Sequence, residues 1–103
     1  MRIQILDEAE RDLKEGFRFY ESRGVGLGDY FLDSLISDID SLQVYAGIHP
    51  VVFGFHRMLA QRFPYAIYYI LHDTTVKVWA VLDCRKNPLN AQKRLFKGNL
   101  KLK

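Results

Sequence analysis

Hydrophobic residues in the first half of the chain follow a helical period after a short apolar start. The start, residues 2–6, predicts a strand. Two amphipathic helices follow, because apolar side chains recur at spacings of four, four and three in two sets: Ala9, Leu13, Phe17 and Tyr20, then Phe31, Leu35, Ile39 and Leu42. Asp7, three residues before Glu10, is expected as the first N-cap and Gly24 as the stop. The glycine-rich segment 24–28 predicts the turn of a helical hairpin.

After Pro50 the period changes to that of β-strands. Three segments rich in β-branched and aromatic residues predict three strands: Val51 to Ala60, Phe63 to Leu71 and Thr75 to Leu82. The polar break at residues 72–74 predicts a tight hairpin. Pro64 is expected at the start of a strand or at an edge of the sheet, because it cannot donate to a ladder. The last strand is expected to present one apolar face, formed by Val76, Val78, Ala80 and Leu82.

The end of the chain turns helical again. Asn87 is predicted as an N-cap, Pro88 as the first helical residue and Gly98 as the stop. The predicted order is β-α-α-β-β-β-α, an α+β fold in which a helical hairpin packs on a mainly antiparallel four-stranded sheet. Neither a linker nor a repeat interrupts residues 1–103, so we expect one domain; the partner of the first strand stays open.

Composition restricts the class of protein. With 49% hydrophobic and 26% charged residues, the sequence is typical of a globular protein rather than a disordered or collagen-like one. The longest apolar run, Ala66 to Leu71, is far shorter than the roughly 20 residues that cross a bilayer. The acidic residues that follow the first few positions are also unlike a signal peptide. A single cysteine, Cys84, can form no internal disulfide, so a reducing cytoplasm is the expected location.

The net charge of +3 conceals two oppositely charged halves. Residues 1–52 carry ten acidic and five basic side chains, whereas residues 53–103 carry two acidic and ten basic ones. This division predicts that the second half faces an anionic partner, either nucleic acid or an acidic protein. The alternative is that the two halves neutralise each other across the fold.

Motifs for common catalytic chemistries are missing from the sequence. It has no glycine-rich phosphate loop, no His-Glu-x-x-His pair and no nucleophile elbow. The histidines, His49, His56 and His72, lack metal-ligand spacing, so we expect neither a metal nor a cofactor. Cys84 lies beside two cations that would favour its thiolate, although a structural cysteine at a strand end is the preferred interpretation.

Basic side chains gather where predicted strands end. Because the start of the third strand and the end of the fourth lie together in an antiparallel meander, we expect Arg62, Arg85 and Lys86 to converge. Arg57 lies on the second strand, and the last helix extends the positive surface with Lys93, Arg94 and Lys97. Strand aromatics could stack on bases, but we assign most of them to packing: Phe63, Tyr65, Tyr68, Tyr69 and Trp79.

Taken in order, these segments resemble the RelE/ParE superfamily of toxins, from bacterial type II toxin–antitoxin systems, which includes plasmid stabilisation proteins. The resemblance covers most of the chain and rests on the order and spacing of its motifs. They include Asp7-x-Ala9-x-x-Asp12-Leu13, Gly26-Leu27-Gly28-Asp29-x-Phe31, His56-Arg57-Met58-Leu59, Arg62-Phe63-Pro64-Tyr65-Ala66-Ile67-Tyr68-Tyr69, Val78-x-Ala80-Val81-Leu82 and Arg85-Lys86-Asn87-Pro88. The resemblance implies a sheet topped by a helical hairpin.

Three departures from the family pattern bear on activity. Members commonly have a histidine where this chain has Asp83, and RNA-cleaving members have an arginine where it has Ala66. They also place a tyrosine or histidine after the last strand, where this chain runs Asn87-Pro88-Leu89-Asn90. Metal-free RNA cleavage needs a general acid and base as well as cations. The only acid beside the basic cluster is Asp83, which we expect to pair with Arg85 or Lys86 or to cap the following turn.

The resemblance therefore implies a ParE-like toxin that binds a target protein such as DNA gyrase and is neutralised by a cognate antitoxin, itself docking in an exposed apolar groove. The implied target-binding residues are Arg62, Arg85, Lys86, Lys93, Arg94 and Lys97. One alternative is a RelE-like endoribonuclease that cleaves mRNA on the ribosome. Its candidate residues are Arg57, Arg62, Asp83, Arg85 and Lys86. A second alternative is a decayed, non-toxic member that only binds antitoxin.

Overall fold

The computed structural model describes residues 1–102, with side chains for residues 1–100. Its elements, in chain order, are β1 (Arg2–Ile5), α1 (Asp7–Glu21), α2 (Leu27–Asp40), α3 (Leu42–Tyr45), β2 (Val51–Val52), β3 (Phe55–Leu59), β4 (Tyr65–His72), β5 (Thr75–Asp83) and α4 (Pro88–Leu102). The predicted α+β fold is thus confirmed, with a helical hairpin, a mainly antiparallel sheet and a final helix. None of the described helices is long and apolar enough to span a membrane.

The sheet has the strand order β1-β5-β4-β3-β2 and contains five strands where four were predicted. The difference arises in the segment from Val51 to Ala60, which was predicted as one strand. A two-residue turn divides it, because Phe53 and Gly54 both adopt positive φ angles, 55° and 85°. Such a turn folds β2 back on β3 as a hairpin. The open question of the first strand is also resolved: β1 pairs in parallel with β5 at the opposite edge.

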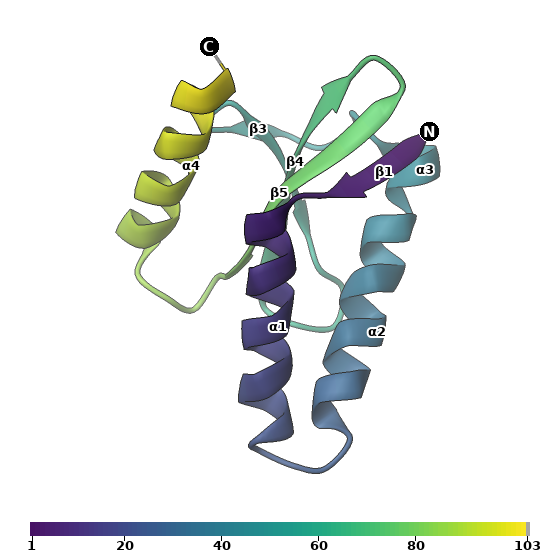
Figure 1. Ribbon diagram of the computed structural model, residues 1–103, viewed down its shortest axis with the longest axis vertical. Coiled ribbons are helices and arrows are strands. Elements are labelled where there is room, and N and C mark those ends of the chain that lie inside the picture. Colours follow the sequence, from purple (N-terminus) through teal and green to yellow (C-terminus); the bar gives the residue numbers. More distant parts are fainter. Residues whose placement is uncertain (103) are drawn as a thin grey trace.

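One face of the sheet is covered by α1 and α2, which lie side by side as a hairpin (Figure 1). The predicted apolar stripe of the second helix is fully buried there, at Phe31, Leu35, Ile39 and Leu42. The two helices approach closely at Gly16, where an added Cβ would lie 2.4 Å from Cζ of Phe31. At the tip, the Glu21 carboxylate accepts hydrogen bonds from the backbone N–H groups of Gly26 and Gly28 and so caps the start of α2.

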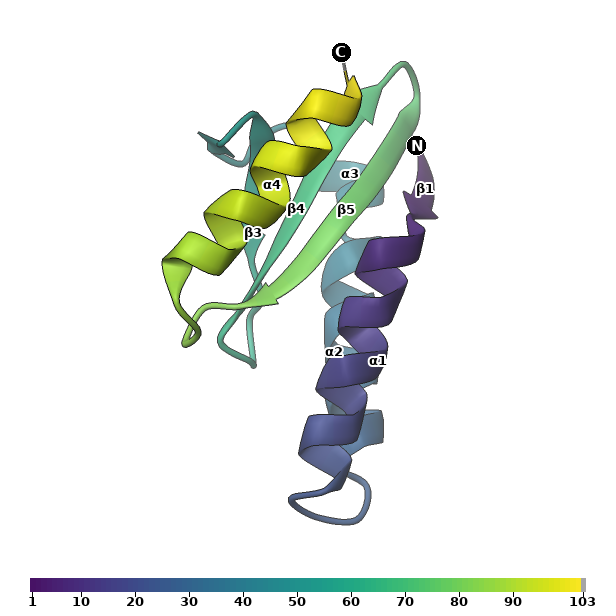
Figure 2. The ribbon, with the colours of Figure 1, turned by 60° about the vertical axis from the view of Figure 1, so that its left-hand side comes forward.

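The opposite face of the sheet is covered by α4, which crosses β4 and β5 (Figure 2). Leu95 is its buried anchor, packed in a small cluster with Phe55, Ala66, Tyr68 and Ala80. The prediction that Gly98 stops this helix is wrong, because α4 continues to Leu102. Gly98 instead allows close packing, since a Cβ there would lie 3.1 Å from Cζ of Phe55 and 3.3 Å from the ring of Trp79.

Two local predictions on β5 and α1 also need correction. The pairing of β4 with β5 is irregular at Tyr68 and Tyr69, which shifts the register around Trp79. Consequently Val76 and Val78 face the hairpin, whereas Ala80 and Leu82 face α4 rather than sharing their side. In addition, the N-cap of α1 is Leu6 and not Asp7, because the Leu6 carbonyl accepts the first helical hydrogen bond, from the Glu10 N–H.

The predicted start of α4 is confirmed. Asn87 precedes Pro88, the first helical residue, and its side-chain oxygen accepts a hydrogen bond of 3.0 Å from the Leu89 N–H. Pro64 lies just before β4, as expected, and its carbonyl accepts a bond from the Cys84 N–H. That contact brings the loop before β4 against the loop after β5, which is where the candidate site lies.

Candidate functional site

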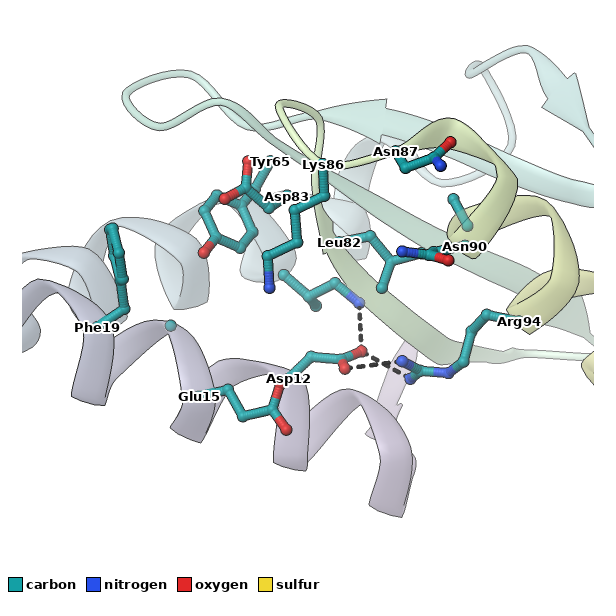
Figure 3. Close-up of a pocket in the computed structure, with 13 residues that line it drawn as sticks. Asp12, Glu15, Phe19, Tyr65, Leu82, Asp83, Lys86, Asn87, Asn90 and Arg94 are labelled. Atoms are coloured by element: carbon teal, nitrogen blue, oxygen red, sulfur yellow. Dashed lines mark hydrogen bonds and ion pairs between the residues drawn. The ribbon is translucent and has the colours of Figure 1, made fainter.

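A polar pocket opens where α1, the end of β5 and the start of α4 meet (Figure 3). Its volume is about 370 Å³, and its lining includes Asp12, Glu15, Tyr65, Asp83, Lys86, Asn87, Asn90 and Arg94. These side chains come from segments separated by up to 82 positions in the sequence, so only the folded chain assembles them. Two of the pocket's carboxylates are held by arginines, and those two contacts decide what the pocket can do.

The first held carboxylate is Asp12, which lies on α1 and is almost fully buried. Arg94 of α4 donates to both of its oxygens, with N···O distances of 2.9 and 2.7 Å, and the backbone N–H of Val81 donates at 2.9 Å. Arg94 also contacts Glu8 through Nε at 3.2 Å. Burial raises the pKa of Asp12, and the bonds from Arg94 and Val81 oppose that rise. This network joins α1, β5 and α4, and its carboxylates neutralise the charge of Arg94.

The second held carboxylate is Asp83, at the end of β5. Arg85 donates to it from its backbone N–H, from Nε and from Nη2, at 2.9 to 3.0 Å. Hydrogen bonds from the Arg85 side chain hold the pKa of Asp83 below its usual value. The same guanidinium donates to the hydroxyl of Tyr20 at 3.0 Å and lies over the ring of Phe19. The expectation that Asp83 pairs with Arg85 and caps the turn is confirmed.

Asp83, Tyr65 and His56 are the candidate groups for proton transfer, and each has defined neighbours. Asp83 stays ionised and accepts hydrogen bonds from Arg85, so it is a poor acid and a poor base near neutral pH. Beside it, burial and the Asp83 charge raise the pKa of Tyr65 to about 12, which keeps its phenol protonated. His56, a candidate base on β3, has its Nδ1 bonded to the His49 carbonyl oxygen at 2.7 Å and stacks on Tyr69. These contacts commit Asp83 to Arg85 and one ring nitrogen of His56 to the His49 carbonyl.

Lys86 is the cation that the pocket leaves available. Figure 3 shows its side chain directed across the pocket toward α1. It forms no ion pair with any residue of the described part of the chain, and it is exposed. Asn87 and Asn90 offer amide groups on the same rim. Together these groups suit an anionic or carbonyl-bearing side chain of a partner.

The structure brings only part of the predicted cationic set together. Arg62, in the loop before β4, and Lys86 are exposed near the same end of the sheet, with Arg85 between the strand end and α1. Lys93 and Lys97 are exposed on α4, away from the pocket's floor. Arg94 turns inward to Asp12, and Arg57 lies across from Tyr68 in the sheet with its Nε buried. Of the implied RNA-cleaving set, Arg62, Asp83, Arg85 and Lys86 thus belong to this strand end, whereas Arg57 lies on β3.

The structure also places the histidines, the cysteine and the strand aromatics for which predictions were made. Within residues 1–102 no three His, Cys, Asp or Glu side chains are grouped to hold a metal. Partial burial of the thiol raises the pKa of Cys84 in spite of the nearby Arg57, which disfavours the thiolate. The strand tyrosines Tyr65, Tyr68 and Tyr69 are buried, and Phe63 and Trp79 pack against the two clusters, which confirms their role in packing.

Asp12 is a site residue that sequence reasoning missed, because it was noted only as part of the Asp7-x-Ala9-x-x-Asp12-Leu13 motif and not as a candidate for the site. A signal was present in its position: Asp12 lies three residues after Ala9 and one before Leu13, on the buried side of α1. Its partner could not be identified in this way. Arg94 lies 82 positions later, on a helix whose docking depends on the sheet.

No protein-family model matches the chain, and no curated protein matches it. Among solved structures, its fold is similar to that of a chain described as "Chromosomal ParDE TA system from P. aeruginosa", where TA stands for toxin–antitoxin. The TM-score is 0.66 at 15% sequence identity, and the match covers 79% of this chain and 92% of that chain. The likeness is one of fold, and it agrees with the α+β architecture predicted from the sequence.

Proposed function

We propose that this chain is the toxin component of a type II toxin–antitoxin system, ParE-like in its action. It inhibits growth by binding a target protein, of which DNA gyrase is the first candidate, and a cognate antitoxin neutralises it. Two observations support the toxin assignment: the fold is similar to that of a chain from a ParDE system, and the ordered motifs resemble the RelE/ParE superfamily.

Binding rather than RNA cleavage is supported by one observation above all, the Asp83–Arg85 pair. Cleavage through the 2′-hydroxyl needs one group to take a proton and another to give one. Asp83, the carboxylate beside the strand-end cations, accepts its hydrogen bonds from Arg85, and burial raises the pKa of the neighbouring Tyr65 to about 12. A cationic surface whose neighbouring carboxylate is held in this way suits docking to an acidic protein.

The proposed target-binding surface follows the same end of the sheet and the outside of α4. Lys86 and Arg62 are exposed at the strand ends, and Lys93 and Lys97 extend the surface along the helix. Arg85 lies at the rim with its charge shared with Asp83. Arg94 contributes through the fold, by fixing α4 to α1, rather than through direct contact with the target.

The experiment induces the chain in growing bacteria and follows growth, DNA supercoiling and transcript integrity together. We expect growth arrest with altered supercoiling and intact transcripts, and inhibition of purified gyrase by the purified chain. Rapid cleavage of translated mRNA with normal supercoiling would assign the chain to the RelE-like alternative. Absence of growth arrest would identify the decayed, non-toxic alternative.

Substitutions at the strand end test where the target-binding surface lies. Lys86→Ala is expected to abolish growth arrest while the unfolding midpoint stays close to that of the wild type, because the side chain is exposed. Arg85→Ala is also expected to abolish growth arrest, but it should lower the unfolding midpoint, because it removes the partner of the nearly buried Asp83. Lys14→Ala is the matched control, since Lys14 is an exposed cation on α1 that pairs with Glu10 one turn away. Full toxicity of both strand-end variants would place the working surface elsewhere.

A further inference from the structure

The guanidinium group of Arg85 is held in one orientation, although its side chain is 51% exposed. Asp83 accepts hydrogen bonds from Nε at 3.0 Å and from Nη2 at 2.9 Å. Nη2 also donates to the hydroxyl oxygen of Tyr20 at 3.0 Å. A guanidinium carries five N–H groups, and these contacts bind three of them. The other two are on Nη1, to which no acceptor within residues 1–100 is bonded.

The hydroxyl of Tyr20 serves this contact and not the packing of the ring. The ring stacks on Phe31 with centroids 5.0 Å apart and meets Phe63 edge to face at 4.9 Å, contacts that a phenylalanine would make equally well. The apolar stripe of α1 therefore explains the ring of Tyr20 but not its hydroxyl. Because the ring is packed on two sides, the hydroxyl oxygen has a fixed position from which it holds Nη2.

A second aromatic ring supports the same guanidinium. Cζ of Arg85 lies 5.9 Å from the centroid of the Phe19 ring, which is within the range of a cation–π contact. Phe19 and Tyr20 are consecutive on α1, and their rings meet edge to face at 5.1 Å. The guanidinium is thus held by a carboxylate of β5 and by two aromatic side chains of α1. An arginine held in this way loses less conformational entropy when it binds a partner.

These contacts also determine which edge of Arg85 a partner can reach. Since Nε and Nη2 are occupied, only the N–H groups of Nη1 can bind a partner. A free guanidinium binds both oxygens of a carboxylate through two nitrogens, whereas Nη1 alone suits one oxygen in a defined direction. The neighbouring Lys86 differs, because its exposed ammonium group attracts an anion without fixing its direction.

We propose that Arg85 determines the specificity of the target-binding surface and that Tyr20 is its positioning residue. Nη1 of Arg85 donates to one carboxylate oxygen of an aspartate or glutamate of the target protein, while Tyr20 holds the guanidinium and does not touch the target. This inference rests on the proposed function, because it assigns roles within the surface that binds the target. It adds a requirement for orientation that a surface acting by charge alone does not have.

Removal of one hydroxyl tests the positioning role. Tyr20→Phe keeps the ring, so the unfolding midpoint should stay close to that of the wild type. The concentration of the chain that half-inhibits purified gyrase should rise about three- to tenfold, because one hydrogen bond that orients Arg85 is lost. Tyr30→Phe is the matched control, since Tyr30 is an exposed tyrosine of the same hairpin that also packs on Phe63. It should leave inhibition unchanged.

Exchange of arginine for lysine tests geometry at constant charge. In Arg85→Lys, a single ammonium group cannot bond to both Asp83 and Tyr20 and still present a fixed N–H to the target. We expect inhibition to weaken by about tenfold or more. Arg18→Lys, the same exchange at an exposed position on α1, should change nothing. A surface that acts by charge alone would tolerate both exchanges.

NMR of the guanidinium groups measures the orientation of Arg85 without any target. The hydrogen bonds to Asp83 and Tyr20 should slow rotation about the Cζ–Nη2 bond, so the two Nη2 protons should give separate signals in the wild type. These signals should merge in Tyr20→Phe and stay separate in Tyr30→Phe. Separate signals in Tyr20→Phe would overturn the positioning role.

The functional outcomes separate this proposal from the proposed function. If the wild type inhibits gyrase and either Tyr20→Phe or Arg85→Lys is equally potent, the proposal is overturned and the toxin assignment stands. If the wild type arrests growth through another target, the inducer level at half-maximal arrest gives the same comparison. A wild type that neither arrests growth nor inhibits gyrase would overturn both.

Discussion

The two faces of the sheet are covered by unlike layers. Under the α1–α2 hairpin lies the larger core, in which aromatic rings meet edge to face and stacked: Tyr20, Phe31, Phe63 and Tyr65. The α4 side has a smaller cluster around Leu95. It also contains two buried nitrogens with no hydrogen-bond partner in the described part of the chain, Arg57 Nε and Trp79 Nε1. The hairpin layer contains the larger buried core, whereas the outer face of α4 stays exposed.

Both apolar and polar contacts join α4 to the rest of the fold. One buried leucine and the contact at Gly98 hold the helix to the sheet, while the Arg94–Asp12 pair fixes it sideways to α1. A helix held in this way can present exposed phenylalanine, leucine and lysine side chains in a defined orientation. The comparison therefore separates residues that determine stability from residues that determine binding, and mutations should act on the two layers differently.

Truncation in the hairpin layer should have the largest effect. Phe31→Ala removes a fully buried ring that stacks on Tyr20 and meets Phe63 and Tyr65. We expect the free energy of unfolding to fall by about 4 kcal/mol, because the cavity left beside Gly16 cannot close fully. Urea unfolding monitored by circular dichroism measures it. A loss below about 1 kcal/mol would mean that this layer is no better packed than the α4 layer.

Breaking the link between the two layers should have the second-largest effect on stability. Asp12→Ala leaves the Val81 N–H without its acceptor and leaves Glu8 as the remaining ion-pair partner of Arg94, at an expected cost of about 3 kcal/mol. Unlike Phe31→Ala, it should raise amide hydrogen exchange first in α4. Asp12→Asn is the control, because it keeps an acceptor for Val81 and removes only the charge. Uniform loss of protection across the hairpin and α4 would show that the layers do not separate.

Much of the hairpin layer could be predicted from the sequence. The stripes at spacings of four, four and three placed Leu13 in α1 and Phe31, Leu35 and Ile39 in α2, and all four are buried. A local period is sufficient there, because each helix turns one continuous apolar stripe to the sheet. The division of β2 from β3 was missed, because Phe53 is an unusual residue for a left-handed turn position and gives no turn signal.

The α4 layer and the site were predicted less well, for reasons of long-range geometry. From sequence alone, a glycine in this position usually marks the end of a helix. The close approach of Phe55 and Trp79 explains why Gly98 lies inside α4 instead. Likewise Lys93 and Arg94 are adjacent cations that the sequence treats alike, yet one is exposed and the other is held by Asp12. The Asp83–Arg85 pair was predicted correctly, since its partners are two positions apart.

The smallest effect concerns a titratable contact at the margin of the hairpin layer. His49 Nδ1 lies 2.5 Å from the hydroxyl of buried Tyr69, which also accepts a bond from the Gly47 N–H. Burial and the neighbouring charge of His56 lower the pKa of His49. The folded state thus binds fewer protons than the unfolded one, and stability present above the unfolded pKa, near 6.5, is lost as the pH falls below it.

His49→Asn, whose amide oxygen can still accept from Tyr69, should flatten the fall in unfolding midpoint between pH 8 and pH 5. His72→Asn, at an exposed position on β4, should not. Equal pH slopes in the wild type and His49→Asn would show that this margin is as insensitive to protonation as the core beneath it.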